Sequence, residues 1–234
     1  MEKKLHKQQQ KVWDEEHKTP EVLLQMNSCE ASFGVKKFWD WLQTQKISKS
    51  FHGLEMCCGK GRNVIWLAQQ NICMTGFDFS SNAIIEAQKR SIAYQADMNT
   101  NFFIQDAIAT WAFPSNTFDF VLDCFATTDI ESQEGREKAV AEMIRVLKPG
   151  GFILVYVMSE EDMYHKDMIA QFPAHEPHSF FHPKTKKFEK VFTREELIDL
   201  YSAVELIVEE RVPKKAVFYD KEYFCNHYWM IFKK

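Results

Sequence analysis

The segment LEMCCGKGRN, residues 54–63, gives the strongest indication of the fold of this chain. The apolar run HGLEMC leads into it and predicts a strand, and the amphipathic run GRNVIWLAQQ begins within it and predicts a helix. Gly59 and Gly61 permit a tight turn between the two and a close approach of the backbone to a ligand. The segment therefore predicts a ligand-binding loop between a strand and a helix.

Two adjacent cysteines, Cys57 and Cys58, stand in this loop where glycine-rich loops usually carry glycine. Neighbouring cysteines do not readily bridge each other, and the six cysteines of the chain form no CxxC pair. The pattern argues against a redox or zinc site, and we expect no metal. We predict a negative φ at Cys57, which a small side chain accommodates.

The alternation of short apolar runs with amphipathic helices continues from Phe51 to Ser159. It predicts right-handed βαβ units and an α/β fold with a doubly wound, mostly parallel sheet and helices on both faces. Ser80 and Thr193 are predicted helix N-caps. The turn LKPGG, residues 147–151, is predicted to separate the last of these helices from its strand.

We expect one domain with four parts. The tail runs VELIVEERV and EYFCNHYWMIFKK are joined by too short a connection for a parallel crossover, so they predict an antiparallel hairpin at the sheet edge. The parts are an N-terminal helical cover (1–50), a cofactor-binding core (51–159), a substrate-cover insertion (160–192), and a C-terminal helix with edge strands (193–234).

The segment 160–192 has little periodicity and is rich in His, Pro, Phe and Lys, which is typical of a functional cover. Its basic run KTKKFEK, residues 184–190, predicts a solvated face, with contact to an acidic substrate as the alternative. The pattern of its histidines favours ordinary loop residues over metal ligands. Its phenylalanines suit a lid over an apolar or planar substrate; they are Phe172, Phe180, Phe181 and Phe188.

The net charge of −4 lacks the basic excess of a dedicated nucleic-acid binder, so a nucleic-acid partner is not expected. The N-terminus is polar, lacks the apolar run of a signal peptide, and predicts a loosely docked helical arm over residues 7–17. No apolar run reaches membrane-spanning length, so we expect a cytoplasmic protein without a membrane partner.

Acidic residues close three predicted strands. Glu55 would repel a pyrophosphate but suits an ammonium or a sulfonium, and Val64 stands where a dinucleotide fingerprint needs glycine, so both residues argue against NAD. Asp78 can accept hydrogen bonds from a ribose diol. Asp106 is placed to meet the edge of an adenine ring. For both aspartates, a helix-capping or turn-forming role is the structural alternative.

The segments LEMCCGKG, GFDFS, IQDAI, FDFVLDCF and IRVLKPGGFILV, in this order and spacing, resemble the class I S-adenosylmethionine-dependent methyltransferases. The resemblance covers residues 51–159, and it implies a Rossmann-like sheet of seven strands, mostly parallel, with an antiparallel C-terminal edge hairpin. It implies that the cofactor is S-adenosyl-L-methionine and the product S-adenosyl-L-homocysteine. The family has three alternating glycines in the loop, and this chain departs from that pattern at Cys57.

The resemblance also implies roles for individual residues. Glu55 corresponds to the acid near the methionine ammonium, and Asp78 to the ribose acid. Trp13, from outside the matched segments, is expected to close the cofactor site or to dock the arm. The other cofactor-binding residues implied are Cys57, Gly59, Gly61, Phe79, Asp106, Ala107, Cys124 and Phe125.

Methyl transfer from a sulfonium is an in-line displacement that positioning alone accelerates, so no obligatory catalytic residue follows from the sequence. Asp129, Tyr164 and His165 are the substrate-side candidates, with a solvated loop acid as the alternative for Asp129. We expect a small-molecule acceptor, because the (D/N)PPY motif of amino-directed DNA methyltransferases is replaced by DCFATTD. The alternatives are a protein or RNA methyltransferase and a non-catalytic S-adenosylmethionine-binding module.

Overall fold

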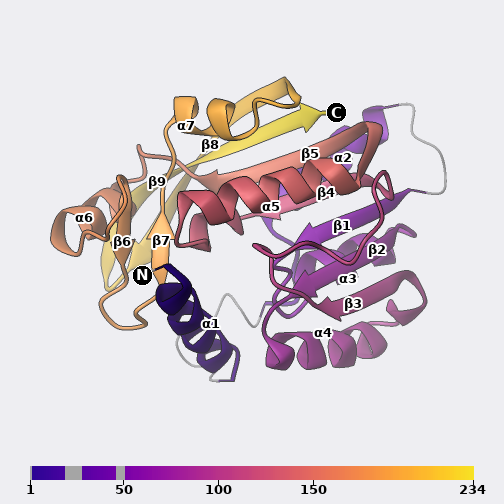
Figure 1. Cartoon of the computed structure of the whole chain (residues 1–234), viewed down its shortest axis with the longest axis horizontal. Helices are drawn as coiled ribbons and strands as arrows, with labels where there is room; N and C mark the ends of the chain where they lie inside the picture. Colours follow the sequence, from indigo (N-terminus) through magenta and orange to yellow (C-terminus); the bar gives the residue numbers. More distant parts are fainter. Residues whose placement is uncertain (1, 19–27, 46–50) are drawn as a thin grey trace.

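The computed structural model describes residues 2–18, 28–45 and 51–234, and parts of the N-terminal cover, residues 19–27 and 46–50, lie outside this description. Seven strands form one sheet in the order β3-β2-β1-β4-β5-β9-β8, with parallel pairing from β3 to β5 and antiparallel pairing beyond it (Figure 1). The predicted sheet is confirmed. Its strands are β1 (His52–Met56), β2 (Cys73–Asp78), β3 (Thr100–Ile104), β4 (Phe118–Cys124), β5 (Leu147–Met158), β8 (Glu205–Phe218) and β9 (Lys221–Lys233).

Helices cover both faces of the sheet, and alternate residues of the strands divide between the two cores. In β5, Ile153, Val155 and Val157 pack on the side of α5 (Gln133–Val146) and α7 (Arg194–Leu200). Leu154 and Tyr156 pack on the other side. That side carries α2 (Phe33–Thr44), α3 (Arg62–Gln69) and α4 (Ser81–Ala93).

The local signals for helix starts are confirmed. The hydroxyl of Ser80 accepts a hydrogen bond from the backbone N–H of Ala83, and Thr193 forms a capping box with Glu196. The predicted turn LKPGG is not a separate connection, because α5 ends at Val146 and β5 begins at Leu147. Gly150, with φ 78°, takes the left-handed conformation inside this run.

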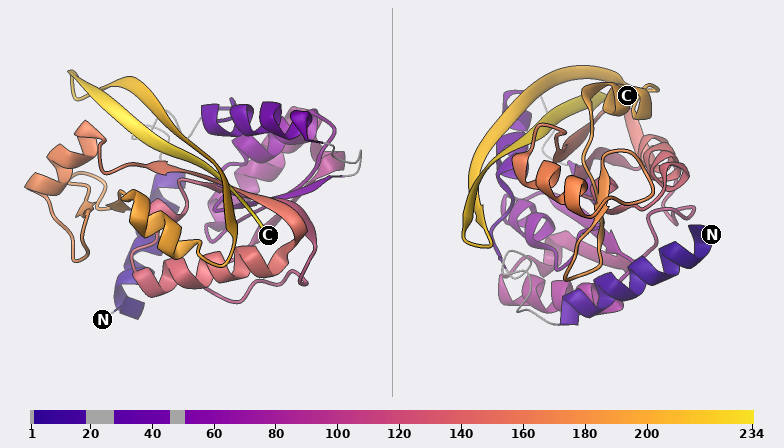
Figure 2. Two further views of the ribbon diagram at one scale, coloured as in Figure 1. Left: turned by 90° about the horizontal axis from the view of Figure 1, so that it is seen from above. Right: turned by 90° about the vertical axis from the view of Figure 1, so that its left-hand side faces the viewer.

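The edge hairpin of β8 and β9 is longer than predicted. Tyr219 and Asp220 form its two-residue turn with φ of 50° and 63°, the left-handed pair typical of tight hairpins. Its far end projects beyond the parallel part of the sheet (Figure 2). The hairpin therefore reaches past the strand ends instead of only closing the edge.

The insertion between β5 and α7 is not a structureless cover. It contains α6 (Met163–Gln171) and a separate antiparallel pair, β6 (Ser179–Phe181) with β7 (Phe188–Lys190). Phe180 and Phe188 are fully buried inside it, and none of its four phenylalanines lines the cavity described below. The predicted aromatic lid is wrong, because Phe180 and Phe188 form the core of the insertion, while Phe172 is exposed away from the cavity.

The N-terminal helix α1 (Glu2–Lys18) lies beside β7 and α4 (Figure 1). The side chain of Gln9 donates to the carbonyl of Lys186 at 3.1 Å and accepts from the N–H of Phe188 at 2.8 Å. Asp14 accepts a hydrogen bond from the Ser80 hydroxyl at 2.7 Å. The prediction of a loosely docked arm is wrong, because polar side chains anchor this helix to two distant elements.

A buried carboxylate, Asp123, fixes the chain where β4 ends. It accepts hydrogen bonds from the N–H and hydroxyl of Thr127, at 3.0 and 2.5 Å, and from the hydroxyl of Tyr201 at 2.8 Å. Thr127 begins the short helix η3 (Thr127–Asp129), and Tyr201 follows α7. This network holds η3, and with it Asp129, in place.

We predict that Tyr201→Phe lowers the free energy of unfolding by about 1.5–3 kcal/mol, because it removes a hydrogen bond to a buried carboxylate. Urea denaturation followed by fluorescence measures the change. Tyr94→Phe, at an exposed tyrosine, is the matched control and should change stability by less than about 0.5 kcal/mol. Equal effects of the two substitutions would contradict the role given to Tyr201.

Candidate functional site

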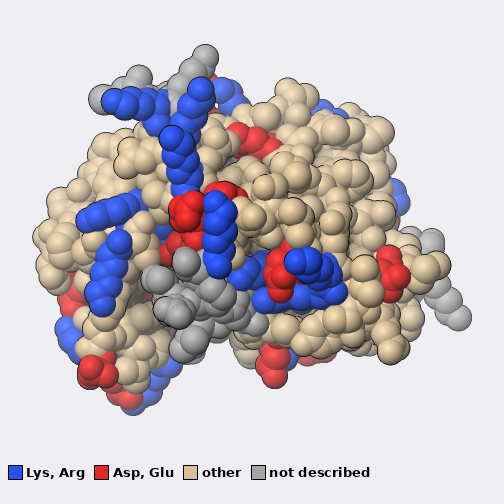
Figure 3. All heavy atoms as spheres, turned by 90° about the horizontal axis from the view of Figure 1, so that it is seen from below, with Lys and Arg blue, Asp and Glu red and all other residues tan. Residues whose placement is uncertain are grey.

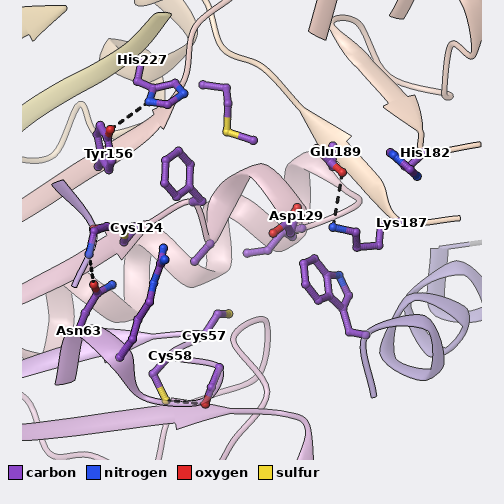
Figure 4. A pocket seen from close by; sticks show the side chains of 18 of the residues that line it. Cys57, Cys58, Asn63, Cys124, Asp129, Tyr156, His182, Lys187, Glu189 and His227 are labelled. Atoms are coloured by element: carbon purple, nitrogen blue, oxygen red, sulfur yellow. Dashed lines mark hydrogen bonds and ion pairs between the residues drawn. The ribbon is translucent and has the colours of Figure 1, made fainter. Parts of the chain in front are cut away.

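A cavity of about 1080 Å³ lies at the carboxyl ends of the parallel strands, walled also by α1, the insertion and the hairpin (Figure 4). Parallel sheets place their ligand sites at this edge, near the point where the strand order reverses. The structure brings nearly all the predicted site residues to this cavity. They are Trp13, Glu55, Cys57, Gly59, Asp78, Phe79, Asp106, Ala107, Cys124, Phe125, Asp129, Tyr164 and His165.

The loop after β1 corrects the prediction for Cys57. Its φ is 53°, so it adopts the left-handed conformation that favours glycine, and the expected negative φ is wrong. The next residue explains why, because the N–H of Cys58 donates to the carbonyl of Phe77 at 2.9 Å and ties the loop to β2. This hydrogen bond turns the chain at Cys57. The left-handed conformation costs a residue with a side chain about 1–2 kcal/mol.

The two glycines of this loop serve different purposes. Gly59, with φ 53°, lines the cavity and leaves open space, since an added Cβ would meet only His17, at 3.4 Å. Gly61, with φ 77°, is the N-cap of α3, and an added Cβ would meet the ring of Phe102 at 2.9 Å. Gly61 is not among the cavity-lining residues, so the structure gives it a packing role instead of the predicted binding role.

Glu55 ends β1 as a buried carboxylate. One oxygen, Oε1, accepts a hydrogen bond from the Asn63 amide at 2.6 Å, while Oε2 has no hydrogen-bond partner among the described residues. Burial raises the Glu55 pKa to about 7. A buried carboxylate oxygen without a donor favours a ligand that supplies one, such as an ammonium group.

Asp78 ends β2 and is also buried. Its carboxylate accepts hydrogen bonds from the N–H groups of Gly59 and Ser80, at 3.0 and 2.9 Å. Burial raises its pKa to about 6. These two bonds hold the carboxylate against the loop after β1, and they leave acceptor capacity for hydroxyl groups of a ligand in the cavity.

Asp106 is engaged by the N-terminal helix. Its Oδ2 lies 2.8 Å from His6 Nε2 and accepts a hydrogen bond from the Gln10 amide at 3.0 Å. The other ring nitrogen of His6 lies 2.6 Å from Glu131. The two carboxylates raise the pKa of His6 to about 10, so this histidine is a cation that joins them.

The wall after β4 is aromatic. Phe125, with φ 66°, packs against the rings of Tyr156 and His227, with centroid separations of 4.8 and 5.3 Å. His227 Nδ1 lies 3.0 Å from the Tyr156 hydroxyl (Figure 4). Burial lowers the pKa of His227 to about 4, so the imidazole is neutral. Cys124, also at this wall, lies 3.2 Å from the Ser32 hydroxyl.

The insertion contributes charged residues to the cavity. Lys187 and Glu189 are nearly buried and 3.6 Å apart, and both line the cavity (Figure 4). The predicted solvated face is therefore wrong for Lys187 and for the buried Lys190, while Lys184 and Lys186 are exposed as predicted.

The substrate-side candidates also face this region. Asp129 is not a solvated loop acid, since it lines the cavity and burial raises its pKa well above the ordinary value. His165 Nδ1 lies 2.7 Å from Asp162, and its Nε2 lies 3.5 Å from Glu189. Against the effect of burial, these two carboxylates raise the pKa of His165 to about 9. Tyr164 packs on Phe218 of the hairpin, at 4.1 Å between ring centroids.

The three histidines of the insertion have separate partners. His175 lies 2.9 Å from the carbonyl of Glu131, and His182 lies 2.9 Å from the Tyr219 hydroxyl. His178 lies 3.4 Å from Glu196. Within residues 2–18, 28–45 and 51–234, no three His, Cys, Asp or Glu side chains gather as possible metal ligands.

Sequence reasoning missed several residues that line the cavity. Arg62 and Asn63 follow the loop after β1, and their closeness to Glu55 along the chain was a usable signal. The others come from elements distant in sequence and carry no local signal of a shared site. They are His6, Gln10, His17, Tyr156, Asp162, Lys187, Glu189 and His227.

Residues 54–151 match the family model described as "Methyltransferase domain". The chain is 31% identical to a demethylmenaquinone methyltransferase of Bacillus licheniformis over 146 residues, which are 60% of this chain and 59% of that protein. The chain spans between 49% and 59% of the length of the first curated relatives it matches.

Solved structures share the fold. A SAM-dependent methyltransferase of Methanosarcina mazei superposes with a TM-score of 0.70 at 22% identity, covering 82% of this chain and 96% of that one. The 1,6-didemethyltoxoflavin-N1-methyltransferase of Burkholderia thailandensis, with bound 1,6-didemethyltoxoflavin and S-adenosylhomocysteine, superposes with a TM-score of 0.63 at 15% identity. It covers 86% of this chain and 76% of that one. No helix in the described ranges is long and apolar enough to cross a bilayer.

The ion pairs of His6 predict a pH-dependent anchor for α1. A folded-state pKa raised from 6.5 to about 10 stabilises the fold fully below pH 6.5, and this stabilisation is lost as the pH rises toward 10. We expect His6→Gln to lower the free energy of unfolding by at least about 1 kcal/mol at pH 6, and by progressively less up to pH 10.

Urea denaturation of both proteins across this pH range measures the difference. His178→Gln, at a more exposed histidine, is the control and should show no such trend. A His6→Gln effect that stays constant between pH 6 and pH 10 would rule out the charged anchor.

Proposed function

We propose that the protein is a class I S-adenosylmethionine-dependent methyltransferase that transfers a methyl group from S-adenosylmethionine to a small molecule, since residues 54–151 match the model of a methyltransferase domain. The proposal rests on one observation: the acidic residues at the strand ends and the charged residues of the insertion line the same cavity. Its volume of about 1080 Å³ is at the upper end for small-molecule sites, which suits a cofactor together with an acceptor.

The residues at the strand ends fit the cofactor. The unpartnered Oε2 of Glu55 would accept a hydrogen bond from the methionine ammonium. Asp78 would accept hydrogen bonds from the ribose hydroxyls while its backbone donors hold it in place. Asp106 and Ala107 would meet the adenine edge, with Asp106 shared between the ligand and the helix α1. Arg62 lines the same part of the cavity and offers a cation to the methionine carboxylate.

The bound cofactor supplies an activated methyl group on a sulfonium sulfur. The task left to the protein is to hold the acceptor in line with this methyl group, which contributes up to about 7–11 kcal/mol in favourable cases. Cys124 and Phe125 wall the cavity where β4 ends, beside the neutral His227. Asp129, Tyr164 and His165 lie on the acceptor side of this wall. In this proposal they orient the acceptor and exclude water.

Support for a small acceptor comes from the relatives named demethylmenaquinone methyltransferase and from the burial of the acceptor side. A methyltransferase acting on protein or RNA would use the basic run of the insertion, but Lys187 and Lys190 of this run are buried. On the face shown in Figure 3, basic side chains form separate groups, several of them beside acidic ones. This distribution gives no extended basic surface on that face.

Calorimetric titration with S-adenosylhomocysteine tests the cofactor site. We expect binding to the wild-type protein and about ten- to a hundredfold weaker binding to Asp78→Asn, because the substitution removes the charge from the proposed ribose contacts. Asp97→Asn, at an exposed aspartate outside the cavity, is the matched control and should bind as the wild type does.

Absence of binding to the wild type at millimolar ligand would overturn the proposed function. Unchanged affinity in Asp78→Asn would remove this residue from the cofactor site. Circular dichroism of each variant checks that its fold is retained.

A further inference from the structure

Carboxyl groups outnumber cations at the acceptor end of the cavity. Two cationic side chains lie there, His165 of α6 and Lys187 next to β7. The carboxyl groups around them come from α1, η3, the start of α6 and β7, and they are Glu16, Asp129, Asp162 and Glu189.

The remaining basic groups that face this end do not alter the balance. The pKa values of His182 and His227 are lowered, mainly by burial, so both imidazoles are neutral. Lys214 lines the cavity from the hairpin but is exposed to solvent. His6 is already shared between Asp106 and Glu131.

The two cations are each shared by two carboxylates. His165 lies 2.7 Å from Asp162 and 3.5 Å from Glu189. Lys187 lies 3.6 Å from Glu189 and 3.5 Å from Glu16, with its ammonium 4.5 Å above the ring of Trp13. Among the described residues, Asp129 has no ion-pair partner of its own within 4.0 Å.

Hydrogen-bond donors are also scarce. Both oxygens of the buried Glu16 lack a hydrogen-bond partner within the described part of the chain. The contacts of Lys187 with its two carboxylates, at 3.5 and 3.6 Å, are longer than good charge-assisted hydrogen bonds. Lys187 therefore leaves the oxygens of Glu16 without a good donor, so this end of the cavity offers acceptors and lacks donors.

Aromatic side chains line the same end. Tyr164 and Tyr219 come from the insertion and the hairpin, Trp13 from α1, and Tyr156 from β5. Aromatic faces attract cations, as the positions of Lys187 over Trp13 and Lys184 over Tyr219 show within the protein itself. Burial raises the pKa of Asp129 and of Glu16, because the nearby cations do not fully compensate these two carboxyl groups. A positively charged organic group beside the aromatic walls would supply the missing charge, and an anionic one would oppose it.

We propose that the acceptor carries a positively charged nitrogen, such as a primary ammonium group, and that Asp129, Glu189 and Glu16 recognise it. The inference rests on the proposed function, because it names the class of molecule that the methyl-accepting end takes. The added cation favours the ionised forms of Asp129 and Glu16, donates hydrogen bonds to them and balances their charge. A neutral molecule supplies no charge, and a carboxylate is repelled.

The test compares ligands that differ only in charge. The protein is saturated with S-adenosylhomocysteine, and two scaffolds are titrated by calorimetry, each as amine, alcohol and carboxylate. The probes are phenethylamine, phenethyl alcohol and hydrocinnamate, and tryptamine, tryptophol and indolepropionate. We expect the amine of at least one scaffold to bind at least about tenfold more tightly than its alcohol, with the carboxylate weakest. The proposal is overturned if in both scaffolds the alcohol or the carboxylate binds as tightly as the amine, or if neither amine binds at millimolar concentration.

A substitution tests whether Asp129 contributes to the preference for amines. Asp129→Asn keeps the shape of the side chain and should weaken amine binding about tenfold while leaving alcohol binding unchanged. The control Asp97→Asn should leave the affinity for every probe unchanged. Equal amine affinities of the wild type and Asp129→Asn would exclude Asp129 from the site.

The first titration separates this inference from the proposed function. If S-adenosylhomocysteine does not bind, the proposed function fails. If it binds and the amines show no preference, only the assignment of a cationic acceptor fails. Retained affinity of Asp129→Asn for S-adenosylhomocysteine shows that the variant is folded.

Discussion

Acidic residues converge at one edge of the parallel sheet, and the elements around this edge must accommodate their burial. Glu55, Asp78 and Asp123 end or nearly end three neighbouring strands, and all three are buried. A buried carboxylate is costly unless donors compensate it. Asp78 obtains backbone N–H groups, and Asp123 obtains two hydroxyl groups and an N–H. In Glu55 the Asn63 amide donates to Oε1, and Oε2 is left for a ligand.

Distant elements close over this edge and turn it into a cavity. The cation His6 holds the helix α1 by joining Asp106 to Glu131. Gln9 adds hydrogen bonds to the backbone of Lys186 and Phe188, the two neighbours of Lys187 in the sequence. The insertion and the hairpin provide the opposite wall. Enclosure lowers the local dielectric constant, so charged groups inside act more strongly on a ligand than they would at the surface.

The sheet, its helices, the edge hairpin and the positions of Glu55 and Asp78 could be predicted because apolar periodicity and strand-end residues are local signals. The backbone at Cys57 could not, because a contact with Phe77 on the neighbouring strand imposes it. The burial of Lys187 could not be predicted from the sequence either, because its partner Glu16 comes from the other end of the chain. A basic run reads as solvated unless the carboxylates that surround it are known.

We infer that one cavity holds the cofactor and the acceptor end to end. A crystal structure with S-adenosylhomocysteine is the sharpest test. We expect the amino group at Glu55, the ribose at Asp78, and the sulfur facing the end lined by Asp129 and Lys187, with open volume between. A sulfur atom directed toward a closed wall, or a ligand bound outside this cavity, would exclude this arrangement.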